Sequence, residues 1–138
     1  WARLPAEDPR RMGGSLGKIL LDSVIVIDYF ADKPQAQEFL EAEADNILVS
    51  VVTRTEVLAG PTAGVGRAVQ RAFLDKLVTL GVDIAVADIA AELRKAHRWK
   101  LPDAFQAALA QFHGLKLATR NTRDFDPRRH PFVLVPYR

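Results

Sequence analysis

The sequence predicts an α/β fold in which a central, mostly parallel sheet of about five strands lies between two layers of helices. Three observations predict this class. Short apolar runs alternate with helix-like segments along the whole chain. The runs are apolar almost throughout, which is typical of strands that are covered on both faces. The 138 residues, of which 49% are hydrophobic, are enough to bury the core of one domain.

Five apolar runs are the predicted strands. They are short and β-compatible, and helix-like or turn-like segments separate them. The predicted strands lie at residues 18–21, 46–50, 82–86, 115–119 and 132–136.

Helices are predicted between the first three runs. The segment at 33–44 carries apolar residues on one face, and the segment at 51–60 ends at a glycine. A longer helix over 62–80 follows a glycine-rich turn. The segment at 22–33 is open to two interpretations, because its apolar residues either extend the first strand or begin a helix.

Two more helices are predicted in the second half of the chain. One covers residues 87–98, with Asp88 as its N-terminal cap. The other begins in the stretch LPDAFQAALA at 101–110. There, Pro102 suits the first helical position and Asp103 complements the positive end of the helix dipole.

The composition excludes several classes of site. The chain has no cysteine, which excludes disulfides, thiolate metal sites and cysteine nucleophiles and fits a cytoplasmic location. No apolar run approaches the roughly 20 residues that span a bilayer, so we expect no membrane partner. Residues 1–17 begin with Trp and are polar. We expect them to be a leader, either added to the natural protein or disordered, ahead of a single domain over 18–138.

Acidic residues follow or flank several of the apolar runs. Ligands of parallel sheets bind at the carboxyl ends of the strands, so acids placed there are candidates for a site. The four candidates are Asp22, Glu56, Asp103 and Asp124. Each has a structural explanation of its own: a helix cap, a solvent-facing helix residue, a partner of the helix dipole and a turn residue.

Taken together, the four acids predict a metal site. Carboxylates that lie close together repel one another unless a cation compensates their charge. Hard divalent cations prefer carboxylate oxygens. With no cysteine and only three histidines in the chain, Mg²⁺ or Mn²⁺ is the expected ion.

Four blocks of the sequence carry a resemblance to a known family. They are ILLDSVIVIDYF, SVVTRTEVLAG, LPDAFQAALA and LATRNTRDFD, in that order. In order and spacing the chain resembles a PIN domain, and in particular the VapC-type ribonuclease toxins of toxin–antitoxin pairs. The resemblance runs from about Lys18 to Tyr137. It implies a PIN-like three-layer α/β/α sandwich and a single PIN-like nuclease domain over 18–138.

The resemblance also assigns residues, position by position. The four family acids correspond to Asp22, Glu56, Asp103 and Asp124, which are the expected catalytic residues. The polar residues that accompany the last acid correspond to Thr119 and Asn121, and Ser23 is a further supporting residue. One departure is Val24, where members of the family usually have Asn or Ser. Asp28 and Asp126 are further acids near the blocks, and we rank them as peripheral.

The resemblance implies an endoribonuclease that needs Mg²⁺ or Mn²⁺ and leaves a 5′-phosphate and a 3′-hydroxyl. Asp22, Asp103 and Asp124 are expected to hold the metal, directly or through water. Glu56 is expected to ligate it or to orient the attacking water. The basic end of the chain is expected to bind flanking phosphates through Arg120, Arg123, Arg128 and Arg129. Two aromatic residues, Trp99 and Phe125, are candidates for stacking on an unpaired base, although burial is favoured for Trp99.

A VapC-type toxin implies a homodimer in the cytoplasm. It also implies a small VapB-like antitoxin that covers the acidic groove, often with an arginine. Three alternatives remain open. One is a PIN nuclease that processes RNA without being a toxin, and another is a PIN-like module that binds RNA or protein without cutting. The third is a phosphoacceptor receiver domain, which is disfavoured because no Asp closes the third run and no Lys closes the last one.

Overall fold

The computed structural model describes residues 18–62 and 64–138, so the expected leader over 1–17 lies outside the described residues. Among these residues, five strands form one sheet in the order β3-β2-β1-β4-β5, and every pairing between them is parallel. The strands are β1 (Ile19–Leu21), β2 (Ile47–Ser50), β3 (Thr79–Leu80), β4 (Lys116–Ala118) and β5 (Val133–Leu134). The predicted number of strands and their parallel direction are therefore confirmed.

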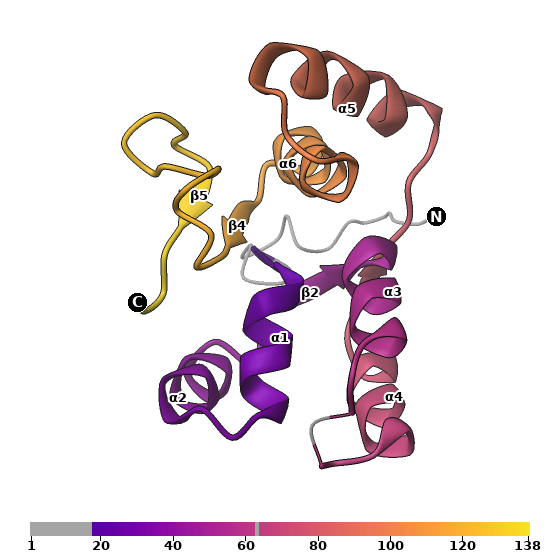
Figure 1. Ribbon diagram of the computed structural model, residues 1–138, viewed down its shortest axis with the longest axis vertical. Coiled ribbons are helices and arrows are strands. Elements are labelled where there is room, and N and C mark those ends of the chain that lie inside the picture. Colours follow the sequence, from indigo (N-terminus) through magenta and orange to yellow (C-terminus); the bar gives the residue numbers. More distant parts are fainter. Residues whose placement is uncertain (1–17, 63) are drawn as a thin grey trace.

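In the described part of the chain, six helices cover the two faces of the sheet, so helices, sheet and helices form three layers (Figure 1). They are α1 (Ser23–Phe30), α2 (Pro34–Ala42), α3 (Val51–Ala59), α4 (Arg67–Asp75), α5 (Ile84–His97) and α6 (Leu101–His113). Successive strand residues point to opposite faces. Leu20 accordingly packs with α5 and α6, whereas Ile19 and Leu21 pack with α1 to α4. This double burial explains why the strands are apolar throughout.

The segment at 22–33 proves to be a helix, because Asp22 ends β1 and caps α1. Its carboxylate accepts a hydrogen bond from the backbone N–H of Ser23 at 2.8 Å. Ser50 does the same between β2 and α3, where its hydroxyl accepts from the backbone N–H of Thr53 at 3.1 Å. Each strand thus passes into its helix within one residue, and this brings the N-termini of α1 and α3 to the same edge of the sheet.

The prediction of a strand at 82–86 is wrong, and so is the prediction that Asp88 caps the following helix. Residues 84–86 belong to α5, which begins one residue after Asp83. The Asp83 carboxylate accepts from the backbone N–H of Val86 at 3.0 Å, whereas Asp88 is exposed in the middle of the helix. A short apolar run does not separate strand from helix by its pattern alone.

The third strand is instead Thr79–Leu80, a two-residue edge strand beside β2. The helix predicted over 62–80 is correspondingly shorter, because α4 ends at Asp75. Gly66 is the N-cap of α4 and has a φ of 87°, a backbone conformation that favours glycine. It lies in the glycine-rich turn that the sequence predicted before this helix.

The start of α5 gives a first prediction. Asp83→Ala should lower the free energy of unfolding by about 1 kcal/mol, because it removes the N-cap hydrogen bond. Asp88→Ala should change it by less than about 0.5 kcal/mol, because an exposed mid-helix position accepts alanine well. Urea denaturation of the two variants measures both values. A larger loss of stability for Asp88→Ala would mean that Asp88, and not Asp83, caps the helix.

Within the described residues, no helix combines the length and the apolar character needed to cross a membrane.

Candidate active site

Asp22 stands at the carboxyl end of the central strand β1 and is nearly buried, with 6% of its surface exposed. Its carboxylate accepts hydrogen bonds from the hydroxyl of Thr119 at 2.6 Å and from the backbone N–H of Ser23 at 2.8 Å. Burial still raises the pKa of Asp22, although these hydrogen bonds lower it. The fold therefore holds a carboxylate where its charge is disfavoured.

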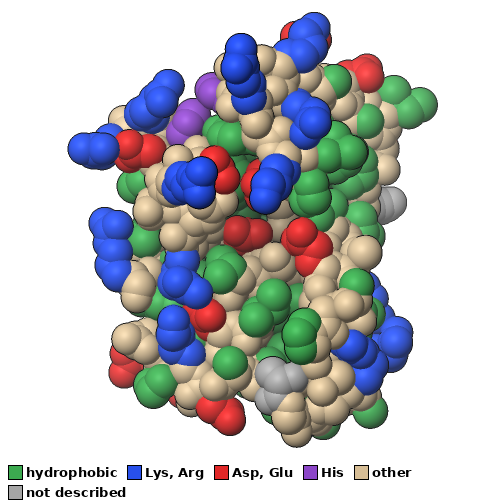
Figure 2. Space-filling model, in the orientation of Figure 1, with side chains coloured by type: hydrophobic (Ala, Val, Ile, Leu, Met, Phe, Trp, Pro, Cys, Tyr) green, Lys and Arg blue, Asp and Glu red, His purple; other side chains and the backbone are tan. Residues whose placement is uncertain are grey.

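Asp103 brings the other predicted acids into the same site. It lies in the first turn of α6 and is half-buried. Burial, together with the negative charges of Asp22, Asp124 and Glu56, raises the pKa of Asp103 to about 6. The four carboxylates, which come from different parts of the chain, thus act on one another. Figure 2 shows acidic side chains gathered in a hollow across this face, with Lys and Arg side chains around it.

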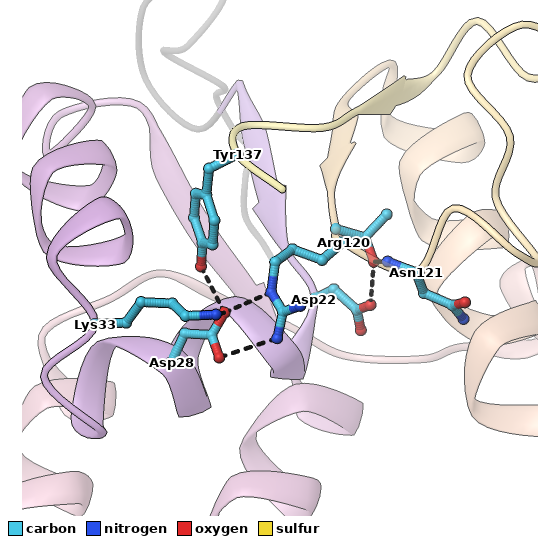
Figure 3. Close-up of polar contacts among 7 residues, drawn as sticks. Asp22, Asp28, Lys33, Arg120, Asn121 and Tyr137 are labelled. Carbon is cyan, nitrogen blue, oxygen red and sulfur yellow. Dashed lines mark hydrogen bonds and ion pairs between the residues drawn. The ribbon is translucent and has the colours of Figure 1, made fainter.

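Three consecutive residues after β4 each hold a carboxylate. Thr119 donates to Asp22, as described above, and Asn121 donates from its side-chain amide to Asp124 at 3.0 Å. Between them, Arg120 donates to Asp28 from Nε at 2.6 Å and from Nη2 at 3.2 Å (Figure 3). Thr119 and Asn121 therefore lie beside Asp22 and Asp124.

Arg120 forms an internal ion pair that the sequence did not predict. Its guanidinium, which we expected to bind a phosphate, is paired with Asp28, and Asp28 is buried although the sequence ranked it as peripheral. Arg128 pairs with Asp126, while Arg123 and Arg129 are exposed and form no ion pair with any described residue. Ser23 contacts Asp22 through its backbone N–H. Val24 packs against the apolar core that faces α1.

A buried glutamine, Gln106, links the site to the core, and the sequence interpretation missed it. Its carbonyl accepts from the hydroxyl of Ser50 at 2.7 Å, and its amide donates to the hydroxyl of Thr53 at 2.6 Å and, more weakly, to Asp22 at 3.5 Å. Thr53 in turn donates to the carbonyl of Leu21 at 3.0 Å. A polar side chain three residues after Asp103, inside an otherwise apolar run, was the available signal.

Gln106→Leu tests this network. The substitution should lower the free energy of unfolding by about 1–3 kcal/mol, because it leaves the buried hydroxyls of Ser50 and Thr53 without their partner. Gln111→Leu, at an exposed position of the same helix, should change it by less than about 0.5 kcal/mol. Chemical denaturation compares the two variants, and equal losses would contradict a specific role for Gln106.

Trp99 and Phe125 are buried, so the prediction that Phe125 stacks on a base is wrong and the burial favoured for Trp99 is confirmed. Phe125 has no exposed surface and Trp99 has 5%. The indole N–H of Trp99 donates to the backbone carbonyl of Asp124 at 3.1 Å, and its ring stacks on His97. Trp99 therefore ties the loop that carries Asp124 to the end of α5.

The donor set at this site fits a hard divalent cation. It consists of carboxylate oxygens; burial raises the pKa of Asp22, and burial with neighbouring negative charges raises that of Asp103, so a cation here would be favourable to both. Within residues 18–62 and 64–138, no three acidic or histidine side chains lie close enough together to hold one ion as they stand. Binding would therefore need the carboxylates to move inward.

An apolar depression of about 220 Å³ lies between α3 and α6, beside the acids. It is lined by Val52, Thr55, Glu56, Leu101, Pro102 and Phe105. Glu56 thus borders both the acidic hollow and an apolar surface.

Comparisons with known proteins give consistent matches. The model of the PIN domain family matches residues 19–129. A chain in a toxin–antitoxin complex from Klebsiella pneumoniae is 34% identical, and the match covers 87% of this chain and 98% of that one, with a TM-score of 0.79. A chain of FitAcB from Neisseria gonorrhoeae is 25% identical, with coverages of 86% and 97% and a TM-score of 0.64.

A chain of DNA-bound VapBC from Salmonella typhimurium is 21% identical. It has the same fold, with coverages of 80% and 92% and a TM-score of 0.69. No curated protein matches the sequence significantly.

Proposed function

Because this chain belongs to the PIN domain family, as a VapC-type member, we propose that it is the ribonuclease toxin of a toxin–antitoxin pair. The observation that carries the proposal is the electrostatic coupling of four carboxylates at the carboxyl edge of a parallel sheet. The proposed reaction is the metal-dependent hydrolysis of RNA phosphodiesters in the cytoplasm.

Asp22, Asp103 and Asp124 are the proposed holders of Mg²⁺ or Mn²⁺. When bound, the ion reverses the local charge, polarises the phosphoryl oxygens and supplies hydroxide near neutral pH. Thr119 and Asn121 keep Asp22 and Asp124 in place through their hydrogen bonds. These two contacts limit the rearrangement that ion binding requires.

Glu56 is the proposed group that orients the attacking water. It lies on α3, and its negative charge acts on Asp103 on α6. Burial and the neighbouring carboxylates raise the pKa of Asp103 to about 6. A cation at the site would hold it in the ionised form that a ligand needs.

Arg123 and Arg129 are the best placed of the four predicted arginines to bind phosphates, because both are exposed and unpaired within the described part of the chain. Arg128 can join them only by releasing Asp126, whose pKa its hydrogen bonds lower to about 2. Contacts of this kind would position RNA without reading its sequence.

The proposed partners are a second copy of the chain and a small VapB-like antitoxin. A guanidinium from the antitoxin would satisfy the same carboxylates that bind metal. The adjacent depression, with Leu101 and Phe105 in its wall, offers an apolar contact beside that charge pair. The Klebsiella protein was solved in a toxin–antitoxin complex, which supports a partner of this kind.

Cleavage of a structured RNA, with and without Mg²⁺ or Mn²⁺, tests the proposed chemistry. Cleavage should require both the metal and Asp103, so EDTA and Asp103→Asn should each abolish it. Asp88→Asn, an exposed acid on α5, is the matched control and should cut normally. RNA cleavage that persists both in EDTA and in Asp103→Asn would contradict the proposed metal-dependent mechanism.

Expression of the chain alone in cells tests the toxin role. The wild type should arrest growth and Asp103→Asn should not. Normal growth with a nuclease that is active in vitro would favour the second candidate, an RNA-processing PIN enzyme.

A further inference from the structure

Asp28 is the centre of a polar cluster that lies outside the four-acid site. Its carboxylate accepts from Arg120 at 2.6 and 3.2 Å and from the hydroxyl of Tyr137 at 2.9 Å, and Lys33 lies 3.8 Å away (Figure 3). We call Asp28, Arg120 and Tyr137 the Asp28 clamp. It joins three segments that are distant in the sequence: helix α1, the loop after β4 and the C-terminal segment after β5.

The clamp holds a buried charge in a defined state. Burial alone would raise the pKa of Asp28, but the hydrogen bonds from Arg120 and Tyr137 outweigh it and the net effect is a lowered pKa. Asp28 is therefore ionised at neutral pH. A two-point contact between a guanidinium and a carboxylate is both strong and directional, so it fixes Arg120 in one orientation.

The position of Arg120 connects the clamp to the acids. Its neighbours in sequence are Thr119, which donates to Asp22, and Asn121, which donates to Asp124. Asp22 caps the start of α1, and Asp28 lies six residues further along the same helix, a rise of about 9 Å. Helix α1 is thus attached at two separated points to one short stretch of backbone.

We propose that Asp28 and Arg120 are positioning residues that hold the Thr119–Asn121 backbone so that Asp22 and Asp124 face the same ion. This proposal rests on the proposed function, because its first test measures RNA cleavage. It replaces the earlier expectation that Arg120 binds the phosphates of RNA.

The first experiment compares Asp28→Asn, Arg120→Met and the double variant in RNA cleavage. Each single variant should lower kcat by about 10- to 100-fold, the usual effect of removing a partner that orients a ligand, with little change in KM. The double variant should be no slower than the slower single one, because the two residues act through one contact. Arg54→Met, which breaks the ion pair with Asp75, is the control and should leave kcat unchanged.

The same variants separate positioning from direct RNA binding. If Arg120 instead bound a phosphate, Arg120→Met would weaken RNA binding and reduce its salt dependence by about one phosphate contact. Asp28→Asn would then release Arg120 and leave RNA affinity unchanged or raised. That pair of results would overturn the proposal.

The second experiment measures binding of Mn²⁺ alone by titration calorimetry, with metal-free protein. Both single variants should bind Mn²⁺ at least about tenfold more weakly than the wild type and Arg54→Met. Tyr137→Phe is a milder variant, because it keeps the aromatic ring against the core and removes only the hydroxyl that contacts Asp28. It should weaken Mn²⁺ binding about threefold, and it keeps the test valid if Asp28→Asn or Arg120→Met does not fold.

The two readouts distinguish the two proposals. Clamp-dependent Mn²⁺ binding by a protein that does not cut RNA would contradict the nuclease and support the positioning role. RNA cleavage and Mn²⁺ binding that are equal in the wild type and the clamp variants would contradict the positioning role alone. A wild-type protein that binds no Mn²⁺ would contradict both.

Discussion

Asp22→Asn should reduce RNA cleavage by about a thousand-fold or more while leaving the protein folded. A metal-held charge at the reacting phosphate is worth several kcal/mol, and about 4 kcal/mol corresponds to a thousand-fold in rate. Asparagine keeps the shape of the side chain, and its carbonyl can still accept from the backbone N–H of Ser23, but its amide nitrogen cannot accept the hydrogen bond that Thr119 donates. The loss should therefore reflect the missing charge and that one hydrogen bond.

The same variant should be more stable than the wild type. Burial raises the pKa of Asp22, so its ionised form destabilises the folded protein at neutral pH, and removing that charge should raise the free energy of unfolding. Single-turnover cleavage and urea denaturation measure the two effects on one preparation. Asp32→Asn, an exposed acid, is the control for both. Loss of activity together with loss of stability would mean that Asp22 serves the fold and not the chemistry.

Metal and pH should act in opposite directions on the stability of the wild type. Because the pKa of folded Asp103 is about 6, above its ordinary value of 3.8, the folded state binds more protons than the unfolded state between these pH values. Stability should therefore fall as pH rises from about 4 to 6 in EDTA. Each pKa unit corresponds to about 1.4 kcal/mol, so about 3 kcal/mol is the upper bound for the contribution of Asp103, and solvent screening of this half-buried group reduces it to roughly 1–2 kcal/mol.

A divalent ion should restore this loss above pH 6. At a hundred times its Kd, a ligand of the folded state adds about 2.7 kcal/mol. Thermal melts with EDTA or Mg²⁺ at pH 5 and pH 7.5 measure the difference, which should be large only at pH 7.5. In Asp103→Asn the part of the pH-dependent fall that Asp103 contributes should disappear, together with most of the Mg²⁺ effect. A rise in Tm with Mg²⁺ that is equal in wild type and variant would place the ion elsewhere.

Much of the architecture was predictable because the strands are short and buried on both faces. Leu20 packs on one side of the sheet and Leu21 on the other, so neither position tolerates a polar residue and the run stands out in the sequence. The third strand could not be predicted in this way. Thr79–Leu80 is an edge strand of two residues with partly exposed side chains, so it leaves no apolar run.

The acids of the site were predictable as candidates because strand ends mark them, but their supporting residues were not. Gln106 contacts Ser50 across 56 positions of sequence, and Arg120 contacts Asp28 across 92. No local pattern encodes such a pairing. Arg120 illustrates the difficulty, because an arginine near acids suits both a phosphate contact and an internal ion pair. Only the fold, which places it over α1, selects the second.

The strand order has a consequence for the cell that makes this protein. β1 lies at the centre of the sheet, with β2 from the first half of the chain on one side and β4 from the last quarter on the other. Asp22 and Glu56 therefore emerge from the ribosome long before Thr119 and Asp124. A nascent chain that has not yet added β4 lacks Asp124, one of the four acids, and the Thr119 hydroxyl that holds Asp22. The proposed site would therefore be complete only when translation is almost finished.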